Sequence, residues 1–238
     1  MEKINLKSIF NQLKVNAEWF GIRKVYESNT YRMIRDGNPQ ANSTDISNGI
    51  MVEVLKNGQF AYAASSDMSI SSIQEAIDKA IIIAESSAAN PLYNFSKNVR
   101  PNNKGSYQSD RNKTHLPLKE INDILFKSYE SLKVSDKIVS ASATARITET
   151  NYQFLSSDGA DIEQDFLIIG SSFDAISQDK GVTQRRTDNG RGRMFQSGYE
   201  VFDESELTTM CKKIGEQAVE LLYADECPTE TTSLVLAP

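Results

Sequence analysis

A stretch of alternating apolar and polar side chains, residues 139–148, constrains the fold of this chain more than any other feature. Apolar and polar residues alternate along it in the order Val139, Ser140, Ala141, Ser142, Ala143, Thr144, Ala145, Arg146, Ile147 and Thr148. Successive side chains of a strand point to opposite faces, so this pattern predicts a strand with one buried and one polar face. Such a strand fits a sheet that other elements cover on one side.

Further strands are predicted on both sides of turn-forming dipeptides. Residues 50–55 and 60–64 flank Asn57-Gly58, and residues 152–156 and 162–173 flank Asp158-Gly159. Both dipeptides accommodate the positive φ angles of tight hairpin turns. The sequence therefore predicts two hairpins, with 182–187 returning as one more strand. A strand over 22–35, rich in Val, Tyr, Thr and Ile, is predicted to precede them and to end at Asp36-Gly37.

Four segments show the apolar spacing of amphipathic helices. They are a short helix over 6–15, a helix that starts with a capping box at Ser72 and Glu75 and ends near Asn90-Pro91, a helix that starts near Pro117, and a last helix capped by Asp203 with Glu206 three residues on. Between the second and third, residues 92–116 are poor in aliphatic side chains, which is typical of an exposed connection.

The predicted fold class is α+β, with antiparallel sheets and helices packed on one face. Each half of the chain reads helix, antiparallel strands, helix, which raises the hypothesis of a duplicated α-β-β-β-α unit. The predicted domains are an amino-terminal subdomain over 1–91, the connection over 92–116 and a second subdomain over 117–238.

Charge and composition exclude several classes of protein. The net charge of −6 and a pI near 5.0 argue against a general nucleic-acid-binding surface, because phosphate contacts need clustered Lys and Arg. No apolar run approaches the ~20 residues of a membrane helix, and the start of the chain has no signal-peptide pattern. Cys211 and Cys227 are too few for a disulfide framework, so a cytoplasmic protein with reduced cysteines is expected.

The chain offers few residues for hydrolytic chemistry. A catalytic zinc needs three protein ligands, whereas the sequence has one histidine, His115, and no HExxH pattern. We expect His115 to be a surface residue and Cys211 a packing residue, and no catalytic or metal-binding residue is predicted. Asp161, Glu163 and Asp165 alternate along one predicted strand, where they could hold a cation or form a solvated strand face.

A loop rich in glycine and arginine, residues 188–199, leads toward the last helix and ends in Gly198-Tyr199. Its glycines allow close backbone approach, and it lacks the Gly-Lys-Ser/Thr ending of a phosphate-binding loop. Two interpretations remain open. In one, Arg191, Arg193, Phe195 and Tyr199 grip a peptide substrate; in the other, the arginines are solvated and Tyr199 packs under the last helix.

Several of these elements, taken in order, resemble the amino-terminal half of the TldD/PmbA family, whose members were once called modulators of DNA gyrase and are regarded as zinc peptidases. The elements are the hairpin from Gly49 to Ala63, the helix that follows it, the turn Ser156-Ser157-Asp158-Gly159, the loop Gly190 to Phe202 and the final apolar segment from Pro228 to Pro238. The loop resembles the TldD-like branch more than the PmbA-like branch.

The resemblance implies a substrate-enclosing and dimerisation region of a zinc metallopeptidase that acts on flexible peptides. The zinc helix, with its HExxxH pattern, would lie beyond Pro238, so the chain alone is expected to be inactive and to carry no cofactor. The implied partners are a peptide substrate and a second subunit, in a homodimer or in a heterodimer with a PmbA-like protein. The alternatives are the matching region of a non-catalytic PmbA-like subunit and an unrelated α+β binding module.

Overall fold

The computed structural model describes residues 5–100, 102–188, 190, 192–226 and 228–236 of the chain. Their main helices and strands are, in chain order, α1 (Leu6–Phe10), β1 (Trp19–Arg35), β2 (Asn38–Lys56), β3 (Gln59–Ser65), α2 (Ile70–Ser87), β4 (Lys104–Gln108), α3 (Leu118–Leu132), β5 (Ile138–Ser156), β6 (Asp161–Asp179), β7 (Val182–Thr187), β8 (Arg193–Phe195) and α4 (Glu204–Glu220). The mixture of helices and mainly antiparallel strands confirms the α+β class.

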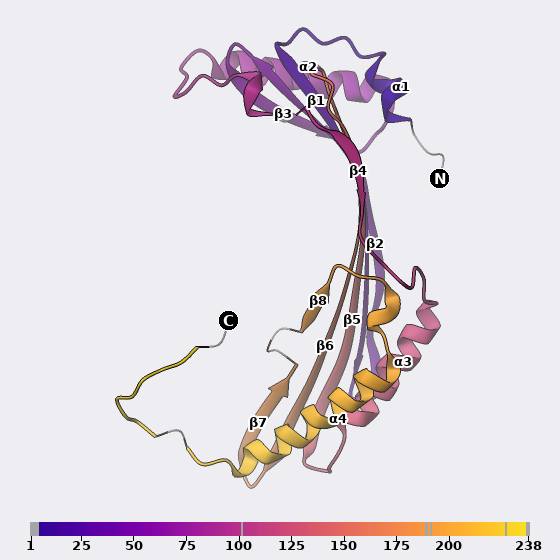
Figure 1. The fold of residues 1–238 in the computed structure, drawn as a ribbon, viewed down its shortest axis with the longest axis vertical. Coiled ribbons are helices and arrows are strands. Elements are labelled where there is room, and N and C mark those ends of the chain that lie inside the picture. The colour runs from indigo at the N-terminus through magenta and orange to yellow at the C-terminus, as the bar shows by residue number, and fades with distance from the viewer. Residues whose placement is uncertain (1–4, 101, 189, 191, 227, 237–238) are drawn as a thin grey trace.

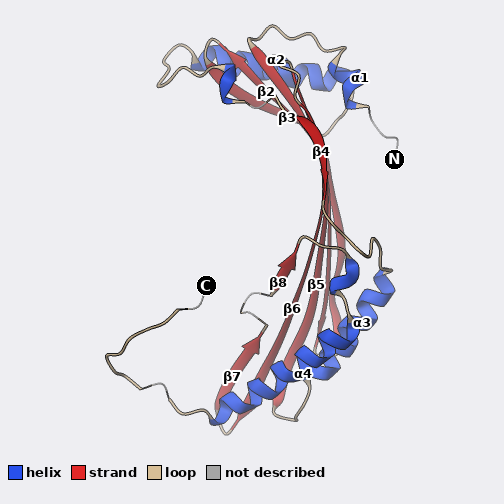
Figure 2. Ribbon diagram, viewed as in Figure 1, coloured by secondary structure: helices blue, strands red, loops and turns tan. Residues whose placement is uncertain are grey.

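All the strands of the described residues join in one sheet of eight. The order is β3-β2-β1-β5-β6-β4, and β7 and β8 also pair with β6. Neighbouring strands are antiparallel except for β4, which runs parallel to β6. Figures 1 and 2 show the long central strands running from α1 and α2 at one end of the molecule to α3 and α4 at the other, with a middle stretch that no helix covers.

Both helix pairs pack on the same face of this sheet. β1 pairs with β5 without a register shift from Gly21 to Arg35, so Ile22 and Ile34, an even number of residues apart, point to the same side. Ile22 lies in the core under α1 and α2, together with its partner Leu155, and Ile34 lies in the core under α3 and α4. The predicted placement of helices on one face is therefore confirmed.

Two separate cores result from this arrangement. The core under α1 and α2 uses the even positions of β2, namely Ile50, Val52 and Val54. The core under α3 and α4 uses four of the predicted apolar positions of β5, Ala141, Ala143, Ala145 and Ile147, together with Phe173 of β6, which is fully buried. The prediction for Val139 was wrong: it is 50% exposed, because the pairing of β5 with β6 shifts register between Ile138 and Ser140 and Ile138 is buried instead. The order α-β-β-β-α occurs in the first half, and the second half repeats it with the short β8 added before α4.

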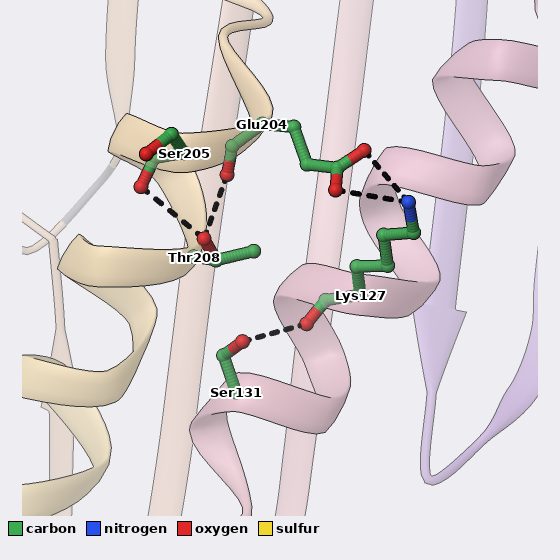
Figure 3. Close-up of polar contacts among 5 residues, drawn as sticks. All are labelled: Lys127, Ser131, Glu204, Ser205 and Thr208. Atoms are coloured by element: carbon green, nitrogen blue, oxygen red, sulfur yellow. Dashed lines mark hydrogen bonds and ion pairs between the residues drawn. The ribbon is translucent and has the colours of Figure 1, made fainter.

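The two helices of the second core also meet through polar side chains at their exposed edges, as Figure 3 shows. The Lys127 ammonium of α3 donates to both carboxylate oxygens of Glu204 on α4, at 2.9 Å each, and this hydrogen bond raises the pKa of Lys127. Thr208 and Ser131 donate their hydroxyls to carbonyl oxygens of the preceding turn of their own helices. Since both members of the ion pair are exposed, apolar burial rather than this pair holds α3 against α4.

The turns and the last cap agree with the sequence. Asn57 and Gly58 have φ angles of 52° and 71° in the turn between β2 and β3, as an Asn-Gly hairpin requires. The hairpin across Asp158-Gly159 joins β5 to β6, and β7 returns along β6 as predicted. The Asp203 carboxylate accepts the Glu206 N–H at 2.8 Å, which confirms the cap of α4.

The predicted end of the first helix and the predicted start of the second were wrong. α1 ends at Phe10, and α2 begins at Ile70 with Ser69 as its N-cap, not with a capping box at Ser72 and Glu75. The Asp67 carboxylate explains the earlier start of α2, because it accepts both the Ser69 N–H and the Ser72 hydroxyl and so fixes the chain before the helix.

One strand, and a long extension of another, lie where no strand was expected. Residues 38–49, which are mostly polar and exposed, extend β2 along β1, and β4 lies within the predicted connection 92–116. Both pair with longer strands while burying little apolar surface, so they lack the alternation that marks a half-buried strand. No helix of the described residues is long and apolar enough to cross a membrane.

Candidate functional site

The loop rich in glycine and arginine lies directly against β6. β8 pairs with β6 in the register Ser171 to Arg193, Gly170 to Met194 and Ile169 to Phe195. Gly192, with a φ of +85°, precedes this strand, and a Cβ atom there would lie 2.7 Å from the carbonyl oxygen of Ser171. A larger residue would push the loop away from the sheet, so glycine at this position holds β8 in place.

Arg193 is half-buried and is held by two neighbouring side chains. Its Nε lies 3.7 Å from Oδ2 of Asp188, which is 6% exposed, and its guanidinium also contacts the sulfur of Met210 on α4. The Asp188 carboxylate in turn accepts the N–H of Phe173 at 2.7 Å, and burial raises the pKa of Asp188. Arg193 thus compensates a buried carboxylate that ties the loop to β6.

Tyr199 belongs to the core under α3 and α4. Its side chain is 6% exposed, packs near Phe202, and donates its hydroxyl to Glu149 at 3.5 Å. Burial, with the Glu149 charge beside it, raises the pKa of Tyr199 to about 12. The geometry around Tyr199 therefore matches the packing interpretation.

Phe195 is 39% exposed, in contrast to the buried Tyr199, and its neighbour Met194 is 56% exposed. The Arg193 guanidinium lies 5.9 Å from the centre of the Phe195 ring, so the structure brings these two candidates together on β8. Arg191 lies outside the described residues. A role in peptide binding for Arg191, Arg193, Phe195 and Tyr199 stays a prediction.

Glu200, which the sequence did not single out, holds the loop to the segment before α3. Its carboxylate accepts the Ser197 hydroxyl and the backbone N–H groups of Gly198 and Lys113. Loss of hydration acts against the charged form, but these hydrogen bonds outweigh it and lower the pKa of Glu200 to about 2. A Cβ at Gly198 would overlap the Lys113 carbonyl oxygen, so the two segments meet only because this residue is glycine.

We predict a stability contribution from Glu200 that depends on pH. Because its folded pKa of about 2 lies below the ordinary value of 4.5, the contribution is fully present above about pH 4.5 and is lost as the pH falls toward 2. Glu200→Gln should therefore lower the urea midpoint at pH 7 and have little effect near pH 2. The matched control is Glu85→Gln on α2, an exposed residue that should change neither midpoint. Equal losses at both pH values for Glu200→Gln would contradict the assignment.

Each carboxylate of the predicted row on β6 interacts with a side chain from another part of the chain. Asp161 pairs with Lys7 at 2.7 Å, Asp165 pairs with Arg111 at 3.0 Å, and Glu163 accepts from the Gln153 amide at 3.4 Å. In the described part of the chain no group of three or more His, Cys, Asp and Glu residues converges as metal ligands would.

The other two candidate ligands stay apart. His115 is exposed, and Cys211 is fully buried, where loss of hydration raises the pKa of its thiol to about 12. Neither residue gathers with other His, Cys, Asp or Glu side chains of the described residues into a group of three, the number of protein ligands that a catalytic zinc needs. The described residues therefore do not fit a catalytic zinc site.

A cluster that sequence reasoning missed lies on the face of the sheet opposite the helices. The segment after α2 returns over this face, where Phe95 contacts Phe60, and Phe60 contacts the buried Trp19. Arg100 follows in the same segment, over the Phe60 ring at 4.5 Å, and its guanidinium donates to Glu53, which is 5% exposed. In the sequence, Glu53 lies between Val52 and Val54 of β2. This alternation was the one sign that Glu53 faces the side of the sheet opposite the helices.

Comparison with protein families identifies the chain. The model of PmbA/TldA metallopeptidase domain 1 matches residues 21–84, and the model of the PmbA/TldA metallopeptidase central domain matches residues 111–222. Together these matches span most of the described sheet and helices. The chain belongs to the PmbA/TldD family.

Individual relatives agree with this assignment. A protein named metalloprotease from Methanothermobacter thermautotrophicus is 23% identical over 235 residues, which cover 98% of this chain and 50% of that protein. Among solved structures, a protein described as a modulator of DNA gyrase from Thermotoga maritima matches with a TM-score of 0.64 at 15% identity, over 88% of this chain and 46% of its own. TldE from Thermococcus kodakarensis matches with a TM-score of 0.56 at 15% identity, over 87% and 44%.

These comparisons show which part of the relatives the chain matches and that the fold is shared. The chain spans about half the length of the relatives that it matches. At 15% identity the solved structures show a shared fold.

Proposed function

We propose that this chain is the amino-terminal, substrate-enclosing and subunit-pairing region of a zinc metallopeptidase of the TldD-like branch, acting on flexible peptides. The observation that carries the proposal is the order of the two family matches, domain 1 followed by the central domain, in a chain that covers half of a metalloprotease. The described residues do not fit a zinc site, so the metal would be held by residues outside them.

The sheet suggests how the region could hold a peptide. The strand at one edge of the sheet is β3, and at the other edge β4, β7 and β8 lie along β6. Each of these outer strands pairs with only one neighbouring strand of the described sheet. An extended peptide can add to such an edge as a further strand through backbone hydrogen bonds, which do not depend on the peptide's sequence. Only a chain without stable structure of its own can take this form, which agrees with flexible peptides as substrates.

The runner-up function is the matching region of a non-catalytic PmbA-like subunit. The family models carry both the PmbA and the TldA names, so they support either branch. The two functions differ in one property of the full-length protein: a TldD-like subunit supplies the zinc and the hydrolysis, whereas a PmbA-like subunit supplies neither.

The proposal is tested on the full-length protein. We expect light scattering to give twice the mass of one subunit, and the dimer to cleave an unstructured peptide while leaving a folded protein of similar size intact. A monomer with full peptidase activity would refute the subunit-pairing role. A dimer without zinc or activity would favour the PmbA-like function.

A further inference from the structure

A cavity of about 650 Å³ opens on the face of the sheet that no helix covers. It crosses five neighbouring strands, from β3 to β6. Its lining residues include Arg23 from β1, Phe154 and Tyr152 from β5, Ile162 from β6, Glu53 from β2 and Tyr62 from β3. Its volume lies within the range of about 300–1,000 Å³ that is typical of small-ligand sites.

The sheet register brings the cavity's side chains together. Arg23 pairs with Phe154, and Phe154 pairs with Ile162, so a cation, an aromatic ring and an aliphatic side chain follow one another across three strands. Tyr152 lies two residues along β5 on the same face. The Arg23 guanidinium lies 6.0 Å from the centre of the Phe154 ring.

The two arginines of the cavity differ in their ion pairing. Arg100 donates to Glu53 through Nε at 2.8 Å and to the Tyr62 hydroxyl at 2.9 Å, and the hydrogen bond to Glu53 raises the pKa of Arg100. The Glu53 charge is thereby compensated within the wall of the cavity. Arg23 is exposed and forms no ion pair with any residue of the described chain. The cavity therefore keeps one uncompensated positive charge next to apolar surface.

We propose that this cavity binds a carboxylate group that neighbours an aromatic or large apolar side chain, with Arg23 pairing with the carboxylate and Phe154 and Tyr152 packing against the apolar group. Arginine pairs with carboxylates through two parallel hydrogen bonds, which gives both affinity and direction. That the ligand is a peptide rests on the proposed function. The carboxylate is then an acidic side chain or the peptide's carboxyl terminus.

The test measures binding to the 238-residue chain by titration calorimetry and by backbone amide shifts, with three blocked dipeptides. Acetyl-Phe-Glu-amide offers a side-chain carboxylate, acetyl-Gln-Phe offers a terminal carboxylate, and acetyl-Phe-Gln-amide offers none. At least one of the acidic peptides should bind about tenfold more tightly than the neutral one, a difference typical of one charge-assisted pair. The amide shifts should be largest in β1 and β5 near Arg23.

Variants assign that preference to one side chain. Arg23→Gln should abolish the advantage of the acidic peptides, and Arg23→Lys should keep part of it. Arg35→Gln is the matched control, because Arg35 is an exposed arginine on the same face of the same strand, at its other end, and should keep the full advantage.

Two results would overturn the inference: equal affinity of all three peptides for the unchanged chain, or an advantage that survives Arg23→Gln. Since the readout is binding and not hydrolysis, a failure here leaves the proposed peptidase function standing, and an inactive full-length protein leaves this site standing.

Discussion

Replacing Phe173 with alanine should lower the free energy of unfolding by about 3–5 kcal/mol, the range found when a buried phenylalanine is truncated. Phe173 lies in β6 with 0% of its surface exposed, in the core that joins the sheet to α3 and α4. The truncation leaves a cavity at the centre of this core. Since domains are commonly stable by about 5–15 kcal/mol, a loss of that size would remove a large part of the total.

The matched control is Phe195→Ala, the same change on β8, a strand that also pairs with β6. Phe195 is 39% exposed, so its truncation should cost about 1 kcal/mol or less. Urea unfolding followed by circular dichroism measures both variants. Similar losses for the two would contradict the assignment of Phe173 to the core and of Phe195 to the surface.

The alternating pattern over 139–148 predicted more of the fold than any other part of the sequence. Four of its five apolar positions, among them Ala143 and Ile147, are buried under α3 and α4 as expected, and Val139 is the exception. The turn dipeptides were equally informative, because Asn57-Gly58 lies in the predicted tight turn. Period and turn chemistry are local properties, and a single sequence shows them directly.

Long-range pairing was the part that sequence could not predict. The polar residues 38–49 become a strand because β1 lies beside them, and β4 forms because β6 offers a free edge. Neither segment buries an apolar face, so neither carries a pattern of its own. The continuous pairing of β1 with β5, which unites both halves in one sheet, also depends on residues far apart in the chain. The division into domains at 92–116 stays a prediction.

The candidate site, like the fold, could be predicted from the sequence only in part. The glycine-rich loop was recognisable, but the partner of Arg193, the buried Asp188, became evident only once β8 was placed on β6. Tyr199 was open to two interpretations because an aromatic residue beside a glycine suits a core as well as a binding loop. The buried Glu53 pairs with the half-buried Arg100, which lies far from it in the sequence, and no local pattern reveals this pair.

On the proposed function, this chain holds peptide, and residues outside its described part carry the metal chemistry. A catalytic zinc site needs at least three ligands that converge on one point, and zinc binding of that kind is tight and releases protons from its ligands. The exposed His115, the buried Cys211 thiol and the paired carboxylates of β6 offer no such point. The 238-residue chain should therefore take up no stoichiometric zinc.

The most direct measurement is the zinc content of the purified 238-residue chain after incubation with zinc and exhaustive dialysis, together with its cleavage of an unstructured peptide. Elemental analysis should find far less than one zinc per chain, and the peptide should stay intact, while the full-length protein retains zinc and cleaves the same peptide. One tightly bound zinc per chain, with peptide cleavage by the chain alone, would contradict the proposed division of roles between this chain and the metal-binding residues.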